Sequence, residues 1–459
     1  MADRKAPETP SPLEELIKHD LSRRDVLKGM AGLAGVAAVP SLLAACGGGA
    51  SPSPSGAASA PPSAAAGSFT LGSNLSDAVP KKALEDIIGA FTTETGITVK
   101  VNTVDHSTFQ DQLSSYLQAT PDDVFTWFSG YRMRYFAGQG LATDISDVWA
   151  KVASRYTDAF KVASTGDDGK QYLVPFVTYA WTVYYRKSLF AEKKYAIPKT
   201  LDEFKALAGK MQADGLDPIG LGQQDGWPAM GHFDIINLRE NGYQFHVDLM
   251  AGKEKWADPK VKQVFTVWKT LLPFYQKGSA GRMWQDAAAG LVQKKTGMML
   301  QPQVGETFAA AGQAEFDDLD FFPWPDHGTQ WDAEKALDAP IDGFMISAKS
   351  PNLTKDLDAA KAFIEFIGKG STQLIYVKVN PSLIGTANDV DPGGYTPLQK
   401  RQAEVIAGAQ KLTQFLDRDT NPAFAGKNGM QAFLTDFIEK PDQDLDAFLT
   451  KIQGFWDSL

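Results

Sequence analysis

Aromatic, acidic and amide side chains occur at several points where the sequence predicts loops that follow strands. Aromatic rings stack on the weakly polar C–H faces of a sugar, and carboxylates and amides hydrogen-bond its hydroxyl groups. Residues of these types at strand ends can therefore bind a small polyhydroxylated ligand. The candidates are Asn74, Trp127, Tyr131, Tyr179, Trp181, Asp225, Trp227 and Asp342.

Trp227 has the most informative local context, because it lies in the run Gln224-Asp225-Gly226-Trp227-Pro228. A large aromatic residue among turn-forming residues is not placed on a helix or strand face by periodicity. For each of the other aromatic candidates, packing in a hydrophobic core is an equally good interpretation. For Tyr184 and Tyr185, which lie within a predicted strand, core packing is the favoured one.

The sequence lacks the spacings that mark common catalytic and cofactor sites. Gly-x-Ser-x-Gly, His-Glu-x-x-His and a phosphate-binding loop are absent, and the five His residues have no metal-ligand spacing. Asp389-x-Asp391-x-Gly393 is similar to the start of a calcium loop but lacks its closing Glu. We therefore expect no catalytic residue, no metal ion and no cofactor.

Strand and helix signals alternate in the part of the chain that must position these residues. Ser68–Gly72 alternates in polarity as a strand does, and a helix with apolar residues three and four apart follows from Pro80 to Gly96. Residues 97–101 predict a second strand, 105–119 a second helix and 121–125 a buried third strand. Such alternation is typical of parallel crossovers, so the predicted fold class is α/β.

The same signals continue to the C-terminus. A capping box at Thr200-Leu201-Asp202-Glu203 predicts the start of a helix. The remaining predictions are strands within residues 179–187, 297–300 and 343–347, and helices over 261–275, 286–294, 353–367 and most of the segment after 430.

Composition places the chain among soluble globular proteins that are large enough for two domains. It has 459 residues, of which 43% are hydrophobic and 22% are charged, and its formal net charge is −10. An acidic chain without basic runs is a poor partner for phosphate backbones, so we expect no binding to nucleic acid. Cys46 is the one cysteine, so no disulfide can form within the chain.

The N-terminal segment has the features of an export signal. Arg23-Arg24 precedes an apolar run, and Leu43-Ala44-Ala45 stands directly before Cys46. This arrangement resembles a twin-arginine signal that ends in a lipoprotein cleavage box. Residues 1–45 are then a removable signal, and 46–67 form a lipidated cysteine with a flexible linker rich in Gly, Ala, Ser and Pro. A buried N-terminal helix is the alternative, but it gives Cys46 no role.

Several short runs, taken in order, resemble the family 1 extracellular solute-binding proteins, the sugar-binding lipoproteins of ABC importers. The runs are Glu94-Thr95-Gly96-Ile97-Thr98-Val99, Pro121-Asp122-Asp123-Val124, Gly169-Lys170-Gln171-Tyr172, Tyr184-Tyr185-Arg186-Lys187, Gly297-Met298-Met299 and Gly343-Phe344-Met345-Ile346-Ser347. Two positions depart from the family pattern. Arg186 stands where Asn is usual, and Gln303 follows Pro302 where an aromatic residue is common.

The resemblance implies a two-lobed periplasmic-binding-protein-like fold whose discontinuous lobes are joined by a hinge. Residues 68–177 with 347–395 would form lobe 1, and 178–346 with 396–459 would form lobe 2. Ligand would lie between the lobes, at the carboxyl ends of the strands. Gln303, at one of these departures, and Phe344, within the last of the matching runs, complete the set of ligand-binding candidates.

The resemblance also implies the role of the protein. We expect a monomeric, lipid-anchored solute-binding protein on the extracellular face of the cell membrane, which captures a mono- or oligosaccharide and delivers it to ABC transporter permease subunits. It would not be an enzyme. Two alternatives stay open: a secreted, lipid-anchored carbohydrate-active enzyme whose carboxylates meet only in space, or the same fold with a polyamine or peptide as ligand.

Overall fold

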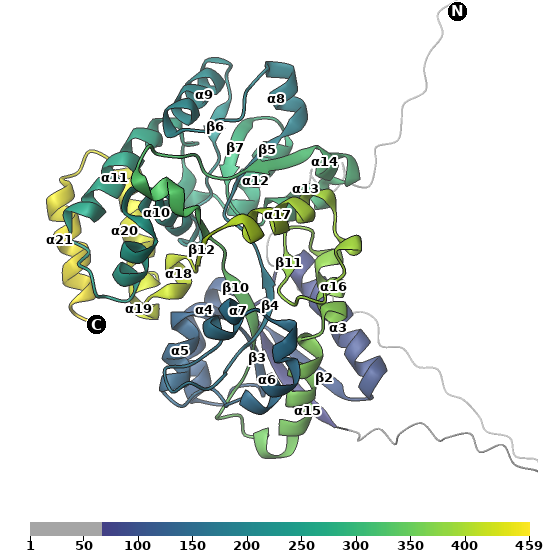
Figure 1. The fold of residues 1–459 in the computed structure, drawn as a ribbon. Coiled ribbons are helices and arrows are strands. Elements are labelled where there is room, and N and C mark those ends of the chain that lie inside the picture. Colours follow the sequence, from purple (N-terminus) through teal and green to yellow (C-terminus); the bar gives the residue numbers. More distant parts are fainter. Residues whose placement is uncertain (1–66) are drawn as a thin grey trace, which may run out of the picture. The chain divides into compact units, whose positions relative to one another are not determined.

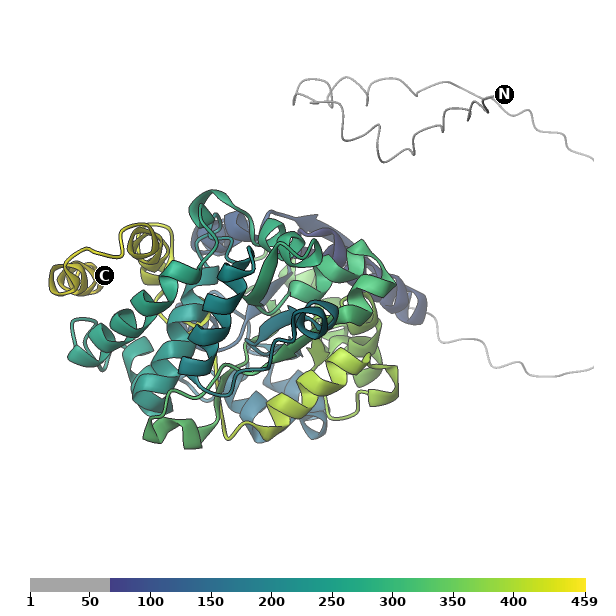
Figure 2. The ribbon, with the colours of Figure 1, turned by 90° about the horizontal axis from the view of Figure 1, so that it is seen from above.

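The computed structural model describes residues 67–459, so the predicted signal, Cys46 and most of the linker lie outside the described residues. The described chain has two lobes, each built on its own β-sheet (Figure 1). A view turned by 90° shows helices on the outside of both lobes (Figure 2). The predicted α/β fold class is confirmed.

The first lobe is built on a mixed six-stranded sheet with the strand order β11-β4-β10-β3-β1-β2. β1 pairs in parallel with β2 and with β3, whereas β10 is antiparallel to both β3 and β4. The strands are β1 (Ser68–Ser73), β2 (Thr98–Thr103), β3 (Val124–Phe128), β4 (Val174–Thr178), β10 (Ile341–Ile346) and β11 (Ile384–Gly385).

Both faces of this sheet are buried, because alternate residues of its strands enter different cores. Val124 packs in a core with Phe344 and Ile346, whereas Phe125 and Met345 pack in a core on the opposite face. The helices of this lobe are α3 (Ala78–Thr95), α4 (His106–Gln118), α5 (Tyr131–Gly138), α6 (Ser146–Val152), α7 (Asp158–Ala163), α15 (Leu353–Ile367) and α16 (Gly370–Val379).

The second lobe is built on a four-stranded sheet with the order β6-β7-β5-β8. Its strands are β5 (Val183–Arg186), β6 (Asp217–Ile219), β7 (Thr296–Leu300) and β8 (Leu319–Phe322). Its helices are α8 (Lys187–Lys193), α9 (Leu201–Ala213), α10 (Pro228–Met250), α11 (Pro259–Leu271), α12 (Trp284–Val292), α13 (Val304–Ala311), α14 (Gln313–Asp318), α18 (Leu416–Asp419), α19 (Pro422–Ala425), α20 (Met430–Glu439) and α21 (Leu445–Trp456). The C-terminal helices α20 and α21 lie beside α10 and α11 (Figure 1).

The chain passes between the lobes at a different point from the one predicted near Met345-Ile346. β10 lies in the six-stranded sheet, between β3 and β4, so this crossing comes before Ile341. The signal for β10 is a buried apolar run, and such a run does not reveal which of two sheets it joins. Asp342 and Phe344 therefore belong to the first lobe.

The chain passes between the lobes once more after residue 395, where the predicted lobe 1 ends. Helix α17 (Pro397–Gly408) lies at this crossing (Figure 1). The Gln399 amide donates to the carbonyls of Val377 and Leu383 in the first lobe, each at 2.8 Å. One turn later, Gln402 donates to the hydroxyl of Tyr184 in the second lobe at 2.7 Å. Beside this helix, β9 (Ala336–Asp338) and β12 (Lys411–Thr413) form a separate parallel pair.

Several local signals are confirmed in the structure. Thr200 and Glu203 form the predicted capping box at the start of α9. Gly96 ends α3 in the left-handed conformation, with φ of 73°, which a glycine adopts without steric cost. The third strand starts at Val124 rather than at residue 121. Just before it, the Asp122 carboxylate accepts from the Tyr116 hydroxyl and the Asp123 carboxylate accepts from the Thr70 hydroxyl.

None of the helices in residues 67–459 is both long and apolar enough to span a bilayer.

We predict that Phe363→Ala lowers the free energy of unfolding by about 3–5 kcal/mol. The ring of Phe363 is fully buried and lies between those of Phe69, Phe91 and Phe344, so its removal leaves a cavity beside the sheet. Chemical denaturation measures the loss. Val162→Ala is the control, because Val162 is 70% exposed. A loss for Phe363→Ala no larger than that of the control would contradict the packing described here.

Candidate functional site

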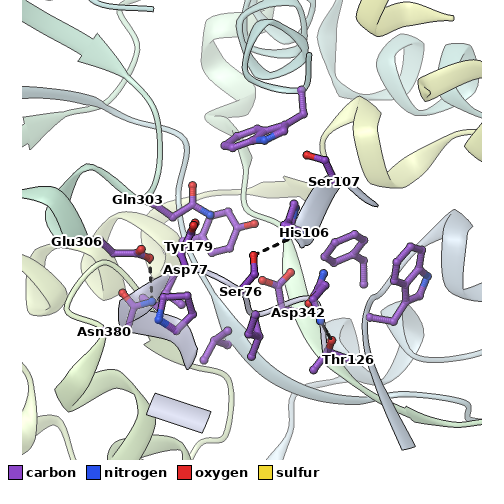
Figure 3. A pocket seen from close by; sticks show the side chains of 18 of the residues that line it. Ser76, Asp77, His106, Ser107, Thr126, Tyr179, Gln303, Glu306, Asp342 and Asn380 are labelled. Atoms are coloured by element: carbon purple, nitrogen blue, oxygen red, sulfur yellow. Dashed lines mark hydrogen bonds between the residues drawn. The ribbon is translucent and has the colours of Figure 1, made fainter. Parts of the chain in front are cut away.

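A pocket of about 110 Å³ lies between the two lobes, where the carboxyl ends of β1, β3 and β4 face loops of the second lobe (Figure 3). β10 runs antiparallel to β3 and β4, so its first residues reach the same edge. The polar and charged residues that line the pocket are Asn74, Ser76, Asp77, Asp105, His106, Ser107, Thr126, Asp225, Gln285, Gln303, Glu306, Asp342, Asn380, Asp417 and Arg418.

Eight of the ten predicted ligand-binding residues line this pocket. They come from both lobes and are Asn74, Trp127, Tyr179, Asp225, Trp227, Gln303, Asp342 and Phe344. They therefore share one pocket in the structure, and their contact with a ligand stays a prediction. Of these, Asn74 and Tyr179 directly follow strands, as the sequence signal required, whereas Trp127, Asp342 and Phe344 lie within strands.

Tyr131 and Trp181 lie outside the pocket, which corrects their predicted placement. Tyr131 begins α5, where its backbone N–H donates to Asp419 at 3.1 Å, and its ring stacks on Tyr135 instead. Trp181 is completely buried in the core of the second lobe. Its ring packs edge-to-face against Trp227, with 6.1 Å between ring centroids, so it supports a pocket residue without reaching the pocket.

The loop before α10 fixes the position of Trp227. Gly226 has φ of 80°, a left-handed conformation that few other residues adopt without strain. The Gln223 amide donates to the Gly226 carbonyl at 2.6 Å and accepts from the N–H of Ala229 at 2.8 Å, which bridges the turn. Trp227 is 9% exposed, so one part of its ring packs in the core and another part lines the pocket.

The end of β1 contributes a buried amide to the pocket. The Asn74 side-chain carbonyl accepts from the Thr126 hydroxyl at 2.8 Å, and the Asn74 backbone N–H donates to that same hydroxyl at 3.0 Å. These bonds fix the side-chain amide of Asn74 beside the pocket, with its Nδ2 still unpaired.

Arg418 is the central cation of the pocket. Its guanidinium forms an ion pair with Asp342 and lies over the ring of Phe128, 3.8 Å from the ring centroid. It also lies 5.6 Å from the ring of Tyr179 and 5.1 Å from that of Phe415. Arg418 comes from α18 and Asp342 from β10, so the pair connects the lobes.

A second ion pair also joins α18 to the first lobe. Asp417 accepts from Arg132 of α5 at 3.3 Å, and both side chains are buried. Burial raises the pKa of Asp342, although Arg418 opposes the shift, and burial raises the pKa of Asp419 to about 6. The short helix α18 therefore joins the first lobe through charged side chains.

Three carboxylates lie near the mouth of the pocket, two on the first lobe and one on the second. Burial is the main cause that raises the pKa of Asp77 and of Asp225, and the neighbouring Asp105 carboxylate adds to both shifts. The pKa of Asp105 itself is lowered, because its side chain accepts from the N–H of Thr108 at the start of α4. Gln285 of the second lobe donates to Asp77 at 3.3 Å.

His106 faces the pocket as a neutral imidazole. Burial lowers its pKa to about 4, and the nearby Arg418 cation adds to this effect. Its Nε2 lies 2.8 Å from the amide of Gln110, and its backbone N–H donates to Ser76 Oγ at 3.2 Å (Figure 3).

Five polar atoms of pocket residues are buried and have no hydrogen-bond partner in the described structure. Three are donors: Asn74 Nδ2, Trp127 Nε1 and Arg418 Nε. Two are acceptors: Gln285 Oε1 and Gln303 Oε1. Buried polar atoms cost free energy when they stay unpaired, so this pocket suits a ligand with both hydroxyl donors and acceptors.

The described part of the chain offers no cluster of three or more His, Cys, Asp and Glu side chains that could bind a metal ion. Amide, backbone or guanidinium partners are present instead for Asp77, Asp105, Asp342, Asp417 and Glu306. The arrangement therefore suits recognition of a neutral polar ligand.

Sequence reasoning missed several pocket residues, above all Arg418, Glu306 and Trp284. Asp105 and His106 directly follow β2, so the strand-end rule that found Asn74 applies to them as well. Arg418 has no such signal: Asp417-Arg418-Asp419 looks like a solvated charge cluster, and only the tertiary fold buries it between aromatic rings.

Comparison with known proteins gives a consistent result. The sequence profile of the family described as bacterial extracellular solute-binding protein matches residues 72–369. An uncharacterized ABC transporter extracellular-binding protein of Pyrococcus horikoshii is 26% identical over 305 residues, which cover 65% of each chain, so the match spans just under two thirds of that relative. The α-glucosides-binding periplasmic protein AglE of Rhizobium meliloti is 25% identical over 82% of this chain and 84% of its own.

Among solved structures, the bacterial solute receptor AcbH is similar in both sequence and fold. It is 41% identical, with a TM-score of 0.81, over 85% of this chain and 99% of its own. The description of that structure reports an exclusive preference of AcbH for β-D-galactopyranose.

We predict that Arg418→Met costs about 2–3 kcal/mol of folding stability at neutral pH. It leaves the Asp342 carboxylate, which is 24% exposed, without its cation, so solvent reduces the penalty of about 3–5 kcal/mol for a fully buried pair. The loss should shrink as the pH falls: without Arg418 the pKa of Asp342 rises further, and protonation then removes the buried charge. Chemical denaturation at neutral and at mildly acidic pH measures both effects.

The double variant Arg418→Met/Asp342→Asn is the matched control, since it also removes the unpaired carboxylate. The double variant should be more stable than Arg418→Met at neutral pH, and its free energy of unfolding should depend less on pH. Equal losses for the single and the double variant at both pH values would contradict the role of this ion pair.

Proposed function

Because the chain belongs to the bacterial extracellular solute-binding proteins, we propose that it captures a hexopyranose monosaccharide between its two lobes and delivers it to the permease subunits of an ABC transporter. The family match covers the strands that form the pocket, from β1 to β10. Phe415 and Arg418, from the C-terminal part of the second lobe, complete the lining of the pocket.

The observation that carries this proposal is the set of unpaired polar atoms among aromatic side chains. A pyranose offers ring faces to Trp227 and Trp284, and hydroxyl groups that both donate and accept. Those hydroxyls can form hydrogen bonds with Asn74 Nδ2, Trp127 Nε1 and Gln303 Oε1, which have no partner within the described chain. A purely apolar ligand would leave these atoms buried and unpaired.

The size of the pocket favours a single sugar ring. A cavity of about 110 Å³ has room for roughly ten waters at about 10–15 Å³ each. An oligosaccharide would extend beyond this space. The similarity to AcbH, which is reported to prefer β-D-galactopyranose, supports D-galactose as the first ligand to test.

The two alternatives from the sequence remain outcomes of the same test. A polyamine would be attracted by Asp77, Asp105 and Asp225, but the inner pocket presents unpaired donors, which an ammonium group cannot satisfy. A carbohydrate-active enzyme would need a carboxylic acid and a carboxylate on either side of a scissile bond, and the reducing-sugar assay tests for that activity.

We further propose that the protein works outside the cell as a lipid-anchored monomer. In this proposal residues 1–45 are a twin-arginine signal that includes Arg23 and Arg24, Cys46 carries the lipid, and the linker to residue 67 separates the lobes from the membrane. Two acyl chains hold a protein at a bilayer far more durably than one. The two lobes would close on ligand by rotation about the crossings near Thr178, Pro340 and α17.

Calorimetric titration with a panel of small ligands tests the proposed function. We expect D-galactose or a closely related hexose to bind to one site, whereas maltooligosaccharides and spermidine bind far more weakly. An assay for reducing-sugar release on the same protein should detect no turnover. Tight binding of spermidine, or turnover of a glycoside, would replace the proposal by the corresponding alternative.

Trp227→Ala should weaken the binding of that sugar by roughly 1–3 kcal/mol, the scale for burying a large apolar side chain. Some loss of stability is also expected, because the ring packs against Trp181 and Phe415. Trp227→Phe is the matched variant, since it retains an aromatic ring at that position. Titration and denaturation should be measured on the same batch. An unchanged affinity together with a lower unfolding midpoint would show that Trp227 acts in packing alone.

Cys46→Ala should release the protein from the membrane without changing its sugar affinity. The thiol of Cys46 is the proposed point of lipid attachment, and the lobes begin more than twenty residues after it. Membrane fractionation of the producing cells, followed by titration of the purified variant, measures both properties. If the variant still partitions with membranes, the segment before Cys46 anchors the chain as an uncleaved helix.

A further inference from the structure

A buried carboxyl group connects the lobes at the back of the pocket. Glu306 lies in the first turn of α13, in the second lobe, and Asn380 follows α16 in the first lobe. The Asn380 amide donates to Glu306 Oε1 at 2.9 Å, and the residues are 8% and 1% exposed (Figure 3). The bond therefore exists only while the lobes are in contact.

The backbone beside Glu306 is adapted to this close contact. A Cβ atom at Gly305 would lie 2.6 Å from the hydroxyl oxygen of Ser382 in the first lobe. A larger residue at position 305 would therefore require the Ser382 hydroxyl to move. The start of α13 and the segment after α16 therefore pack closely against each other across the two lobes. We call this contact the Glu306–Asn380 latch.

The groups around Glu306 include no cation that could balance an ionised carboxylate. They are the neutral amide of Asn380, the phenol of Tyr376 on α16, and the carboxyl group of Asp77 in the loop after β1. Arg418 also lines the pocket, but its charge is already paired with Asp342. An isolated buried carboxylate costs several kcal/mol of desolvation, so protonation is the less costly state.

We propose that Glu306 is a positioning residue that latches the closed lobes as a neutral carboxylic acid, so that capture of the ligand takes up a proton at this group. The proposal rests on the proposed function, because lobe closure around a sugar is what the latch would stabilise. As a neutral acid, Glu306 accepts from Asn380 through one oxygen and retains its proton on the other.

The direction of the pH effect follows from the two states. In the closed lobes, burial above all raises the pKa of Glu306 to about 8, and the Asp77 carboxylate adds to the shift. In open lobes the hydrated group should titrate near its ordinary value of about 4.3. The equilibrium constant for closure is therefore highest below about pH 4.3. It falls by up to about tenfold per pH unit as the pH rises towards 8.

Other groups of the pocket titrate with closure, and they must be separated from Glu306. Asp77 and Asp225 have raised pKa values and would act in the same direction. His106 would act in the opposite direction, because burial lowers its pKa to about 4, but it is neutral in both states above about pH 7.5. Tyr376 stays protonated, since burial raises its pKa well above 10.0.

Calorimetric titration with D-galactose in two buffers of different ionisation enthalpy tests the proposal. At about pH 7.5 the wild-type protein should take up about three quarters of a proton per sugar bound, and Glu306→Gln close to none. Gln still accepts a hydrogen bond from Asn380 but cannot ionise, so its affinity should change little between about pH 7 and 8.5, where that of the wild type falls severalfold. Glu439→Gln, on the exposed surface of α20, is the matched control and should behave as the wild type does.

The outcomes separate this proposal from the proposed function. Sugar binding without proton uptake in the wild type, or with equal uptake in Glu306→Gln, overturns the latch and leaves the receptor function intact. If D-galactose does not bind, small-angle scattering of the protein alone decides: the latch predicts a smaller radius of gyration at about pH 6.5 than at about pH 9. This compaction should be absent from Glu306→Gln, and an identical pH response of the two proteins would overturn the proposal.

Discussion

The structure depends on one constraint: two separately packed lobes must meet across a seam that is made of polar groups. Each sheet buries its own apolar residues, so the strand ends of the first sheet and the helices and loops of the second lobe carry amides, carboxylates and guanidinium groups into the seam. These groups need partners once the lobes exclude water. Pairs between the two lobes supply those partners: Arg418 with Asp342, Gln285 with Asp77, and Glu306 with Asn380.

The same constraint explains why the pocket can bind a ligand. Groups such as Trp127 Nε1 and Asn74 Nδ2 have no partner across the seam, so only a ligand or water can complete them. Aromatic rings line the same cavity. The same set of buried polar residues therefore stabilises the contact between the lobes and recognises the ligand. A bound ligand supplies the hydrogen-bond partners that some of these residues lack.

The sequence predicted the parts of this arrangement that depend on local order along the chain. The α/β class, the capping box at Thr200 and the position of Asn74 after β1 all follow from periodicity and turn residues. Trp181 was misplaced, because a residue that follows a crossing can point into either lobe. The assignment of β10 to the first lobe and the burial of Arg418 depend on contacts between segments about seventy or more residues apart. No local pattern encodes such contacts.

A crystal structure of the protein with D-galactose tests the central claim most directly. The account predicts one pyranose between the lobes, with its faces beside Trp227 and Trp284 and its oxygen atoms within hydrogen-bond distance of Asn74 Nδ2, Trp127 Nε1 and Arg418 Nε. A sugar bound elsewhere, or one between the lobes that leaves these three donors unpaired, would contradict it.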